Sequence, residues 1–498
     1  MLSGIYGVLG ALVGVGSLAL VVNACGDDCS VSNTCGGATP TTDDGGSDGP
    51  VQADGGGDVV QVPADCNVMA DPKDSPACVV DGFGVFVDAT SGADRNPGTK
   101  AQPVQTIGAA LGKLGGKPRV YVCEGTYAES VKLTAAVSVY GGFACGGWTY
   151  SGTKAKVAPT AVGYALVIDK VSDVVMVEDV SFSALAGTDA SPSSIAAFAN
   201  GSPQVTLRRV ELVAGKGFAG KSQAKAADGA LMTAMPTAGT LNGNAGSSSV
   251  GGFAQLCTCV GGGTSKGGGG GNIGGDGNNG ETAQTVVEPA GATGAGQTGT
   301  QCAVSGSGTR GSDAPNAAAA LRAMKSGVLT ETGWAPELGQ NGTAASAGQG
   351  GGGGGGAGGG GGGGACGGCG GSAGQGGGGG GASVALLALQ SPVTLAQCVL
   401  TTSDAGEGGA GGAGGAGLAG GTKGARGGAA CDGGNGGKGG NGGAGGGGAG
   451  GLSVGVLYKG TKPAIDAAIT TGAKGSAGTG AASNNGVDGQ KADSLEAP

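Results

Sequence analysis

Short apolar runs, each followed by a turn signal, dominate the chain from Gly84 onward. Within these runs apolar residues alternate with polar ones, which is the pattern of a strand with one buried face. The runs lie at 85–88, 120–123, 125–127, 131–133 and 137–143. Between the first two, apolar residues at 107, 110, 111 and 114 fall on one face of a helix. We therefore predict short strands and one short helix over Ile107–Leu114, with Thr106 as its N-cap.

The later chain repeats one unit of this pattern. Residues 172–182, 202–212 and 391–400 read SDVVMVEDVSF, SPQVTLRRVEL and SPVTLAQCVL, and the last two follow similar strands at 194–197 and 383–386. A weaker copy runs from Ser453 to Ile469. Each unit is strand, turn, strand, turn, strand and loop, and one unit alone cannot bury its apolar face. We therefore interpret the units as successive coils of one solenoid.

The stretch from Val85 to Phe143, FVDATSGADRNPGTKAQPVQTIGAAL followed by VYVCEGTYAESVKLTAAVSVYGGF, carries a resemblance. It resembles the first coils of the pectin-lyase-like right-handed parallel β-helix, and specifically the DUF1565-type entry segment of secreted and surface proteins. The resemblance implies a mainly β fold whose open end is closed by the short helix. It also places Asp94 and Arg95 in the entry loop of the fold, and not in a catalytic pair.

Long glycine-rich inserts follow the coils at one phase of the repeat. They run from Leu212 to about Ala382, from Leu400 to about Gly451, and from Ile469 to the end. Inserts at one phase emerge from one face of a solenoid, which is often the interaction face. The predicted organisation is a signal peptide (1–24), a cysteine-containing flexible tether (25–80), the cap helix and first coils (81–213), an insert (214–382), a coil (383–402), an insert (403–451), the last coil (452–471) and a tail (472–498).

The inserts contain most of the 124 glycines of the 498 residues. Residues 408–421 and 433–451 follow a Gly-Gly-X period of three and resemble the glycine-rich repeats of PGRS-type surface proteins. A period of three fits ordered polyglycine-II helices, in which glycine faces let backbones approach and exchange hydrogen bonds. Flexible disordered loops are the alternative, because glycine loses the most entropy on ordering. Within the first insert, Ser312–Ser326 (SDAPNAAAALRAMKS) has the composition of a helix.

The amino terminus carries an export signal. Leu2 to Ala24 contain no charged residue, and Val22-Asn23-Ala24-Cys25 resembles a bacterial lipoprotein lipobox, which implies lipidation of Cys25. An uncleaved amino-terminal anchor is the alternative, since the span is long enough to cross a bilayer. In both cases we expect the bulk of the chain in the cell envelope, at the outer membrane or cell surface, with the membrane as a partner.

Export makes disulfides the default state of the remaining thirteen cysteines. The natural sequence neighbours are Cys66 with Cys78 and Cys123 with Cys145, although spacing does not fix connectivity. An odd number of cysteines leaves one free or intermolecular thiol. A metal site is the weaker alternative, and its candidates are Cys257, Cys259, Cys366 and Cys369.

Charge and composition exclude several function classes. The net charge is −9 and histidine is absent, so no basic field attracts nucleic acid and no histidine-based triad or metal site exists. We expect no cofactor and a structural, adhesive or binding role, with surface proteins, polysaccharide or a second copy as partners. The alternative is a polysaccharide lyase or hydrolase, because the pectin-lyase-like fold hosts such enzymes. Its candidate residues lie in neighbouring repeats: Asp173, Glu178, Asp179, Arg208, Arg209 and Glu211.

Overall fold

The computed structural model describes residues 60–235, 238–245, 250–280, 302 and 306–498. They belong to a unit that spans Asp58–Pro498 and is separate from Met1–Gly57. The predicted signal peptide, Cys25, Cys29 and Cys35 lie outside the described residues. Within the described ranges, no helix has the length and apolar character that crossing a membrane requires.

The regular structure is dominated by parallel strands that form two sheets of 11 and 6 strands. The larger sheet consists of two stacks that meet on the long strand β18 (Val393–Thr401) and its partner β20 (Ala464–Thr470). One stack contains β1 (Gly84–Val87), β2 (Arg119–Cys123), β5 (Ser138–Phe143), β8 (Val175–Glu178) and β11 (Val205–Arg208). The other contains β3 (Gly125–Tyr127), β6 (Ala155–Val157), β9 (Val180–Ser183) and β12 (Glu211–Val213).

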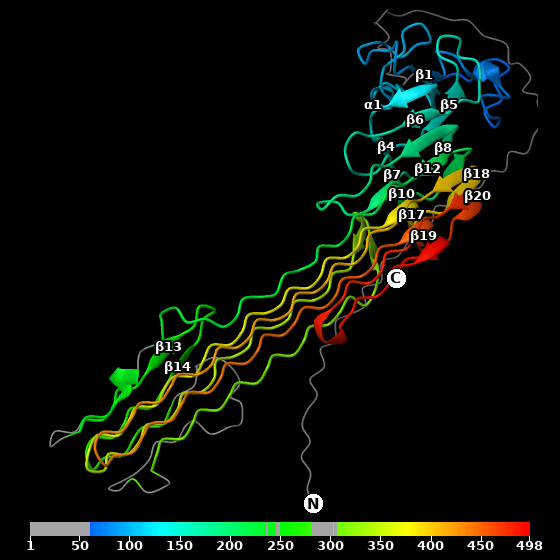
Figure 1. Cartoon of the computed structure of the whole chain (residues 1–498). Coiled ribbons are helices and arrows are strands. Elements are labelled where there is room, and N and C mark those ends of the chain that lie inside the picture. The colour runs from blue at the N-terminus through cyan, green and yellow to red at the C-terminus, as the bar shows by residue number, and fades with distance from the viewer. Residues whose placement is uncertain (1–59, 236–237, 246–249, 281–301, 303–305) are drawn as a thin grey trace, which may run out of the picture. The chain divides into compact units, whose positions relative to one another are not determined.

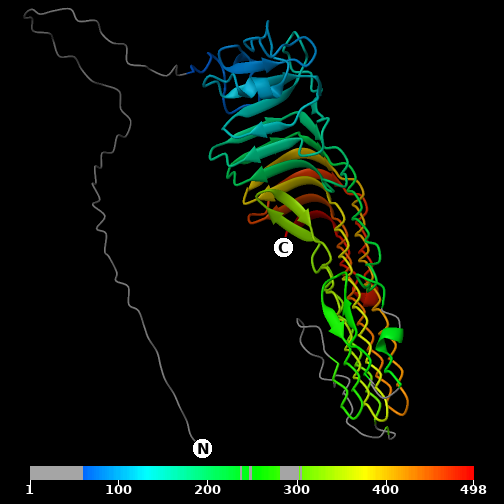
Figure 2. The same ribbon diagram turned by 90° about the vertical axis from the view of Figure 1, so that its left-hand side faces the viewer.

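The smaller sheet closes the coils on their third side. Its strands are β4 (Val131–Leu133), β7 (Leu166–Asp169), β10 (Ser194–Asn200), β17 (Ser383–Leu389), β19 (Ser453–Lys459) and β21 (Lys491–Glu496). The chain visits the three stacks in turn and then begins the next coil, as Figure 2 shows. This arrangement is a parallel β-helix, so the predicted fold class is confirmed.

Aliphatic side chains from all three stacks fill the interior of the coils. Val177, Leu207 and Leu395 occupy one register across β8, β11 and β18, and each is fully or almost fully buried. The helix α1 (Ile107–Leu111) adds Ile107 and Ala110 to the same core. Burial of such side chains is the main favourable contribution to folding.

Helix α1 begins where the sequence predicts and ends three residues earlier. The Thr106 side chain accepts a hydrogen bond from the Ala109 amide (3.1 Å), which confirms it as the N-cap. The carboxylate of Glu129 accepts from the amides of Ile107 (2.7 Å) and Gly108 (2.9 Å). These bonds satisfy amides that have no partner within the helix. In the entry loop, Asp94 accepts from the backbone amides of Gln105 and Thr106 (3.0 and 2.9 Å), which is a structural role.

The inserts leave the coils between the second and third stacks. The chain departs after β12, β18 and β20 and returns into β17, β19 and β21. In the β6–β7 and β9–β10 connections of the earlier coils the same place is spanned by short loops. Figure 1 shows the green, yellow and orange segments of the inserts running side by side. We call residues 214–229, 306–324, 337–354, 359–382, 402–427, 433–452 and 471–490 the glycine bundle.

The helix predicted at Ser312–Ser326 is wrong. These residues are extended, and the amides of Ala314, Ala317 and Ala320 donate to the carbonyls of Lys438, Asn441 and Ala444 at 2.9, 2.9 and 2.8 Å. A helix would turn those amides inward to bond within the segment. Hydrogen bonds to the neighbouring glycine segment have therefore overridden the helix propensity of the alanines.

Small elements lie outside the coils. Antiparallel hairpins are formed by β13 (Leu256–Thr258) with β14 (Thr264–Lys266) and by β15 (Gly327–Thr330) with β16 (Gly333–Pro336). Single turns of 3-10 helix occur at Pro76–Cys78, Ala238–Leu241 and Ala481–Ser483. The second hairpin packs on the coils, because Trp334 and Leu329 join a buried cluster with Phe198 and Leu387.

Among the described residues, two disulfides lie in the amino-terminal segment and first coils, and three link segments of the glycine-rich inserts. The bonds are Cys66–Cys78, Cys123–Cys145, Cys257–Cys366, Cys259–Cys369 and Cys302–Cys431. The four cysteines considered as metal ligands are thus paired with one another in two bridges that tie separate segments of the first insert together. Of the described cysteines only Cys398 is free, and burial raises the pKa of its thiol.

Candidate functional site

The glycine bundle is held together by backbone hydrogen bonds that recur at every third residue. Ala214, Gly217 and Gly220 donate to the carbonyls of Thr401, Asp404 and Glu407 at 2.9, 2.9 and 2.7 Å. Ala405, Gly408 and Gly411 donate in the same way to Ala473, Ser476 and Thr479 at 2.9, 2.8 and 2.8 Å. The outgoing segments therefore lie parallel to one another and continue the order of β12, β18 and β20.

Returning segments lie between the outgoing ones and run antiparallel to them. Gly406, Gly409 and Gly412 donate to Gly381, Gly378 and Gln375 at 2.9, 2.8 and 2.8 Å, so that one partner advances by three as the other recedes by three. The segment 433–451 illustrates how many other segments one segment of the bundle contacts. Its residue Gly439 donates to Leu418, its residue Gly440 donates to Ser346, and its residue Lys438 accepts from Ala314. Three different segments are thus bonded within one triplet.

This close approach leaves no room for a side chain at most of the inward glycine positions of the bundle. Gly436, Gly437, Gly439 and Gly440 are buried, whereas Asn435 and Lys438 at the intervening positions are exposed. A Cβ atom added at Gly439 would collide with the carbonyl of Cys369, and one at Gly415 with the carbonyl of Ala227. The Gly-Gly-X period therefore separates two inward positions from one outward position, which carries the side chains that another molecule can meet.

A second candidate site is a cluster of charges on the outer face of the first stack. Glu178 ends β8 and Arg208 ends β11, and the two residues are paired in the sheet register. Asp179 and Arg209 follow them at a corner where both have a positive φ, of 54° and 51°. Because this left-handed corner recurs from coil to coil, the sequence pairs Glu178-Asp179 and Arg208-Arg209 are stacked side by side.

The contacts within the cluster are short and shared. Arg209 Nη2 lies 3.0 Å from Glu178 Oε2 and 2.8 Å from Asp179 Oδ2, and Arg209 Nη1 lies 2.9 Å from Asp71 Oδ2. Arg208 Nη1 pairs with Asp71 and lies 3.3 Å from Glu178 Oε1. Tyr150 donates to Asp179 Oδ2 at 3.1 Å. The structure thus brings together Glu178, Asp179, Arg208 and Arg209 from the sequence candidates.

The other two candidates stand apart from these contacts. Asp173 accepts a hydrogen bond from the amide of Val174 (2.7 Å) in the turn before β8, and Glu211 lies in β12. Neither takes part in the ion pairs of the cluster among the described residues. Asp71 was missed by sequence reasoning, because it lies more than a hundred residues earlier in a segment predicted to be tether. The nearby Cys66–Cys78 pair was the available signal that this segment is ordered.

The charges in the cluster shift one another's pKa values. Burial, reinforced by the charge of Asp71, raises the pKa of Glu178 to about 7. Burial acts in the same direction on Asp71, but the hydrogen bond from Arg209 and the charges of both arginines lower its pKa overall. Burial lowers the pKa of Arg209, and the hydrogen bond and charge of Asp179 more than offset it. Glu178 is therefore the group in this cluster that titrates near neutral pH.

A cavity of about 600 Å³ adjoins the cluster. It lies between the segment 60–71 and the outer faces of β2, β5 and β8. Glu178, Asp71 and Arg208 form one part of its wall, and Arg119 and Ser138 are the other polar side chains of the lining. The remainder is mainly apolar, formed by Val60, Val62, Val68, Met69, Ala70, Phe83, Pro118, Tyr140, Val174 and Met176.

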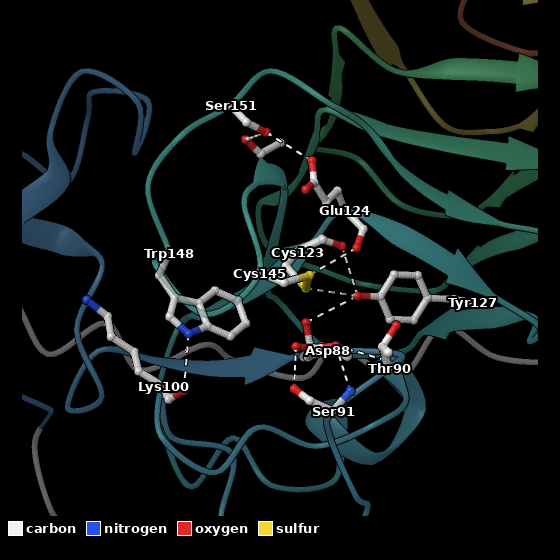
Figure 3. The surroundings of a disulfide bond; sticks show 12 residues. Asp88, Thr90, Ser91, Lys100, Cys123, Glu124, Tyr127, Cys145, Trp148 and Ser151 are labelled. Atoms are coloured by element: carbon white, nitrogen blue, oxygen red, sulfur yellow. Dashed lines mark hydrogen bonds between the residues drawn. A yellow bond between two sulfur atoms is a disulfide. The ribbon is translucent and has the colours of Figure 1, made fainter.

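A third group of polar side chains surrounds the Cys123–Cys145 disulfide near the end of β1 (Figure 3). A carboxylate oxygen of Asp88 and the sulfur atoms of Cys123 and Cys145 all lie within 4.8 Å of one another. Atoms of these types can bind a metal ion. A cysteine binds a metal through its thiolate, and these two sulfurs are instead bonded to each other. Burial raises the pKa of Asp88, but hydrogen bonds from Ser91 and Thr90 lower it overall. Asp88 thus organises the Thr90–Ser91 turn, accepting from both amides and from the Ser91 hydroxyl at 2.8, 3.0 and 2.6 Å.

Comparison with known proteins gives one family. Residues 90–204 match the model of a family described as "Protein of unknown function (DUF1565)". Neither the curated proteins nor the solved structures that were searched contain a match to the chain. The match covers the coils from the entry loop through β10 and ends just before β11, and it agrees with the resemblance found in the sequence. This part of the chain is therefore similar to the DUF1565 family, and its parallel strands fit a domain of the β-helix type.

Proposed function

We propose that the protein is an exported, lipid-anchored protein of the cell surface, in which a β-helix carries a glycine bundle for structural, adhesive or self-associating contact. The observation that carries the proposal is the three-residue spacing of hydrogen bonds between segments of the bundle. That spacing is expected of polyglycine-II helices, which have three residues per turn. A bundle of this kind is a stiff body that displays its outward side chains in regular rows.

The outward side chains suit broad contact with a surface. Ala413, Ala416 and Asn435 are exposed and small, and exposed charges lie beside them on Lys438, on Asp228, which accepts from the Ala416 amide, and on Asp313, which accepts from the Lys438 amide. The described part of the chain also contains five disulfides, which favours an oxidising compartment. The disulfides support a role outside the cytoplasm, together with the lipobox-like sequence around Cys25.

Localisation is tested by surface labelling and protease shaving of intact cells that express the natural chain or Cys25→Ser. We expect the natural chain in the membrane fraction and accessible to label, and the variant released from the membrane. Equal membrane retention of the two proteins would contradict the lipid anchor.

Order in the bundle is tested separately by limited trypsin digestion of the native protein. Lys438 is exposed, but its amide and carbonyl are bonded to Asp313 and Ala314. Proteolysis requires local opening of the backbone, so we expect the Lys438–Gly439 bond to be cleaved much more slowly under native conditions than in denaturant. Rapid cleavage there under native conditions would favour flexible loops and remove the basis for a stiff display surface.

A second candidate function is hydrolysis or elimination on a polysaccharide. The observation that favours it is the meeting of Asp71, Glu178 and Asp179, of which Glu178 has a pKa suited to general acid–base chemistry. All three carboxylates are held by Arg208 or Arg209, which is the arrangement of a structural network. Release of reducing or unsaturated sugar ends from a polysaccharide panel, lost in Glu178→Gln, would establish the enzyme.

A further inference from the structure

Arg119 is a buried cation with an incomplete set of partners. It opens strand β2 and is 3% exposed. Its Nη2 donates to the carbonyl of Val68 at 3.0 Å, and its guanidinium lies 5.1 Å from the ring centroids of both Phe83 and Tyr140. Its Nη1 has no hydrogen-bond partner in the described part of the chain, where no carboxylate pairs with it either.

An arrangement of this kind costs free energy unless an anion completes it. A buried charge is normally paired, and leaving it unpaired destabilises the folded protein. The two aromatic rings recover part of this cost through cation–π attraction. Neither ring offers a hydrogen-bond acceptor to Nη1, so this atom is left for a further partner. A carboxylate is the group that best matches the edge of a guanidinium.

The neighbouring Arg208, unlike Arg119, is already paired with carboxylates. Arg208 also lines the cavity, but it already pairs with Asp71 and Glu178. An incoming anion near Arg208 would meet two carboxylates, whereas at Arg119 it would meet a cation and two rings. The charge pattern of the cavity therefore directs an anionic group to Arg119.

The rest of the lining defines the body of the ligand. Val62, Val68, Val174, Met69 and Met176 offer aliphatic surface and adaptable thioethers. The volume of about 600 Å³ falls in the range of small-molecule sites. We propose that the cavity between segment 60–71 and the sheet binds an aliphatic monocarboxylate, with its carboxylate on Arg119 and its chain along the valine and methionine side chains.

The proposal is tested on the full chain by isothermal titration with octanoate and, as the uncharged comparison, 1-octanol. We expect saturable binding of octanoate and binding of octanol at least about tenfold weaker. Arg119→Met removes the charge and keeps a long apolar side chain, and it should weaken octanoate binding at least about tenfold while leaving octanol unaffected. Lys156→Met, which removes an exposed cation on β6, is the matched control and should bind as the natural chain does.

A second variant keeps the test decisive if Arg119→Met unfolds. Met176→Trp narrows the cavity without touching its charges and should weaken both ligands, provided that circular dichroism shows natural folding. Absence of octanoate binding to the natural chain would overturn the proposal. Equal affinity for octanoate and octanol, or natural binding by a folded Arg119→Met or Met176→Trp, would overturn it as well. None of these outcomes depends on the localisation of the protein or on the order of the glycine bundle.

Discussion

The coils and the glycine bundle have the same order of neighbouring segments, but different groups fill their interiors. In the coils, residues of neighbouring strands pair one to one, and every second side chain, mostly valine or leucine, points into the centre. In the bundle, segments pair at every third residue, and closely packed glycine backbone fills most of the centre, with a few buried side chains such as those of Cys366 and Cys369. The amide of Ala214 bonds to Thr401 at the edge of the coils, and three residues later Gly217 bonds to Asp404 in the bundle.

The difference shows that neighbouring segments can keep the same order from the coils into the bundle while the source of their stability changes. Burial of apolar surface stabilises the coils, whereas the bundle depends on many hydrogen bonds and on dispersion between closely packed backbones. Ordering glycine also costs more conformational entropy than ordering any other residue. We therefore expect the bundle to open locally before the coils unfold.

The strongest way to break the coils is to empty their core. Leu207→Ala removes a fully buried side chain that lies between Val177 and Leu395. It should lower the free energy of unfolding of the coils by about 2–5 kcal/mol, because a cavity remains where the side chain was. Chemical denaturation followed by far-UV circular dichroism measures this loss.

The exposed valine of the same sheet is the control for that variant. Val399→Ala, at a side chain 43% exposed, should cost no more than about 0.5 kcal/mol. Equal losses in the two variants would mean that the aliphatic core does not stabilise the coils in the manner described.

The bundle is broken by adding a single carbon atom at an inward position. Gly415→Ala places a methyl group against the carbonyl of Ala227 and should destabilise the bundle by about 1–3 kcal/mol. Hydrogen exchange followed by mass spectrometry should show faster exchange in residues 402–427 and 433–452, with exchange in β8 and β11 unchanged. Ala413→Ser adds one atom at an exposed outward position and should leave both regions unchanged. Equal effects of the two substitutions would refute the division into inward and outward positions.

The smallest expected effect concerns the charges on the coils. The pKa of Glu178 is raised from 4.5 to about 7, so between these values the folded protein holds a proton that the unfolded chain releases. The free energy of unfolding should therefore fall as the pH rises through this interval. Glu178→Gln should reduce that fall by about 1 kcal/mol, because solvent around the partly exposed Arg208 screens the charges of the cluster.

Thermal unfolding at pH 5 and pH 8 measures this difference. Asp71, whose pKa is lowered from 3.8, contributes stability that is lost only as the pH falls below that value, outside the interval. Glu211→Gln, which changes a carboxylate outside the cluster, is the control. An identical pH dependence in the natural chain and Glu178→Gln would contradict the raised pKa.

Sequence pattern predicted the coils well because the physics there is local. Alternation in 202–212 and 391–400 places Leu207 and Leu395 inward, and each repeat carries the same information. Repetition also placed Glu178 and Asp179 in the repeat that neighbours the one with Arg208 and Arg209. The place of Asp71 could not be predicted, because it depends on how segment 60–80 folds back over the sheet.

The bundle was harder to predict because its determinant lies between segments. An alanine-rich stretch such as 312–326 has high intrinsic helix propensity. Nothing within the stretch indicates that its amides bond to the carbonyls of Lys438, Asn441 and Ala444 in the folded protein. Arg119 was missed for a similar reason. Its surroundings are Val68, Phe83 and Tyr140, which come from three separate parts of the chain.

The antiparallel bonding of Gly406, Gly409 and Gly412 to Gly381, Gly378 and Gln375 limits how such a protein can change in length. Adding one or two residues to a segment would turn outward side chains inward for all positions beyond the insertion. Adding a triplet preserves the faces and lengthens the segment by about 9 Å, at roughly 3.1 Å per residue. Neighbouring segments must lengthen with it to keep their partners. At the level of the gene, tolerated growth or shortening of the bundle therefore proceeds in steps of nine nucleotides, made in several places together.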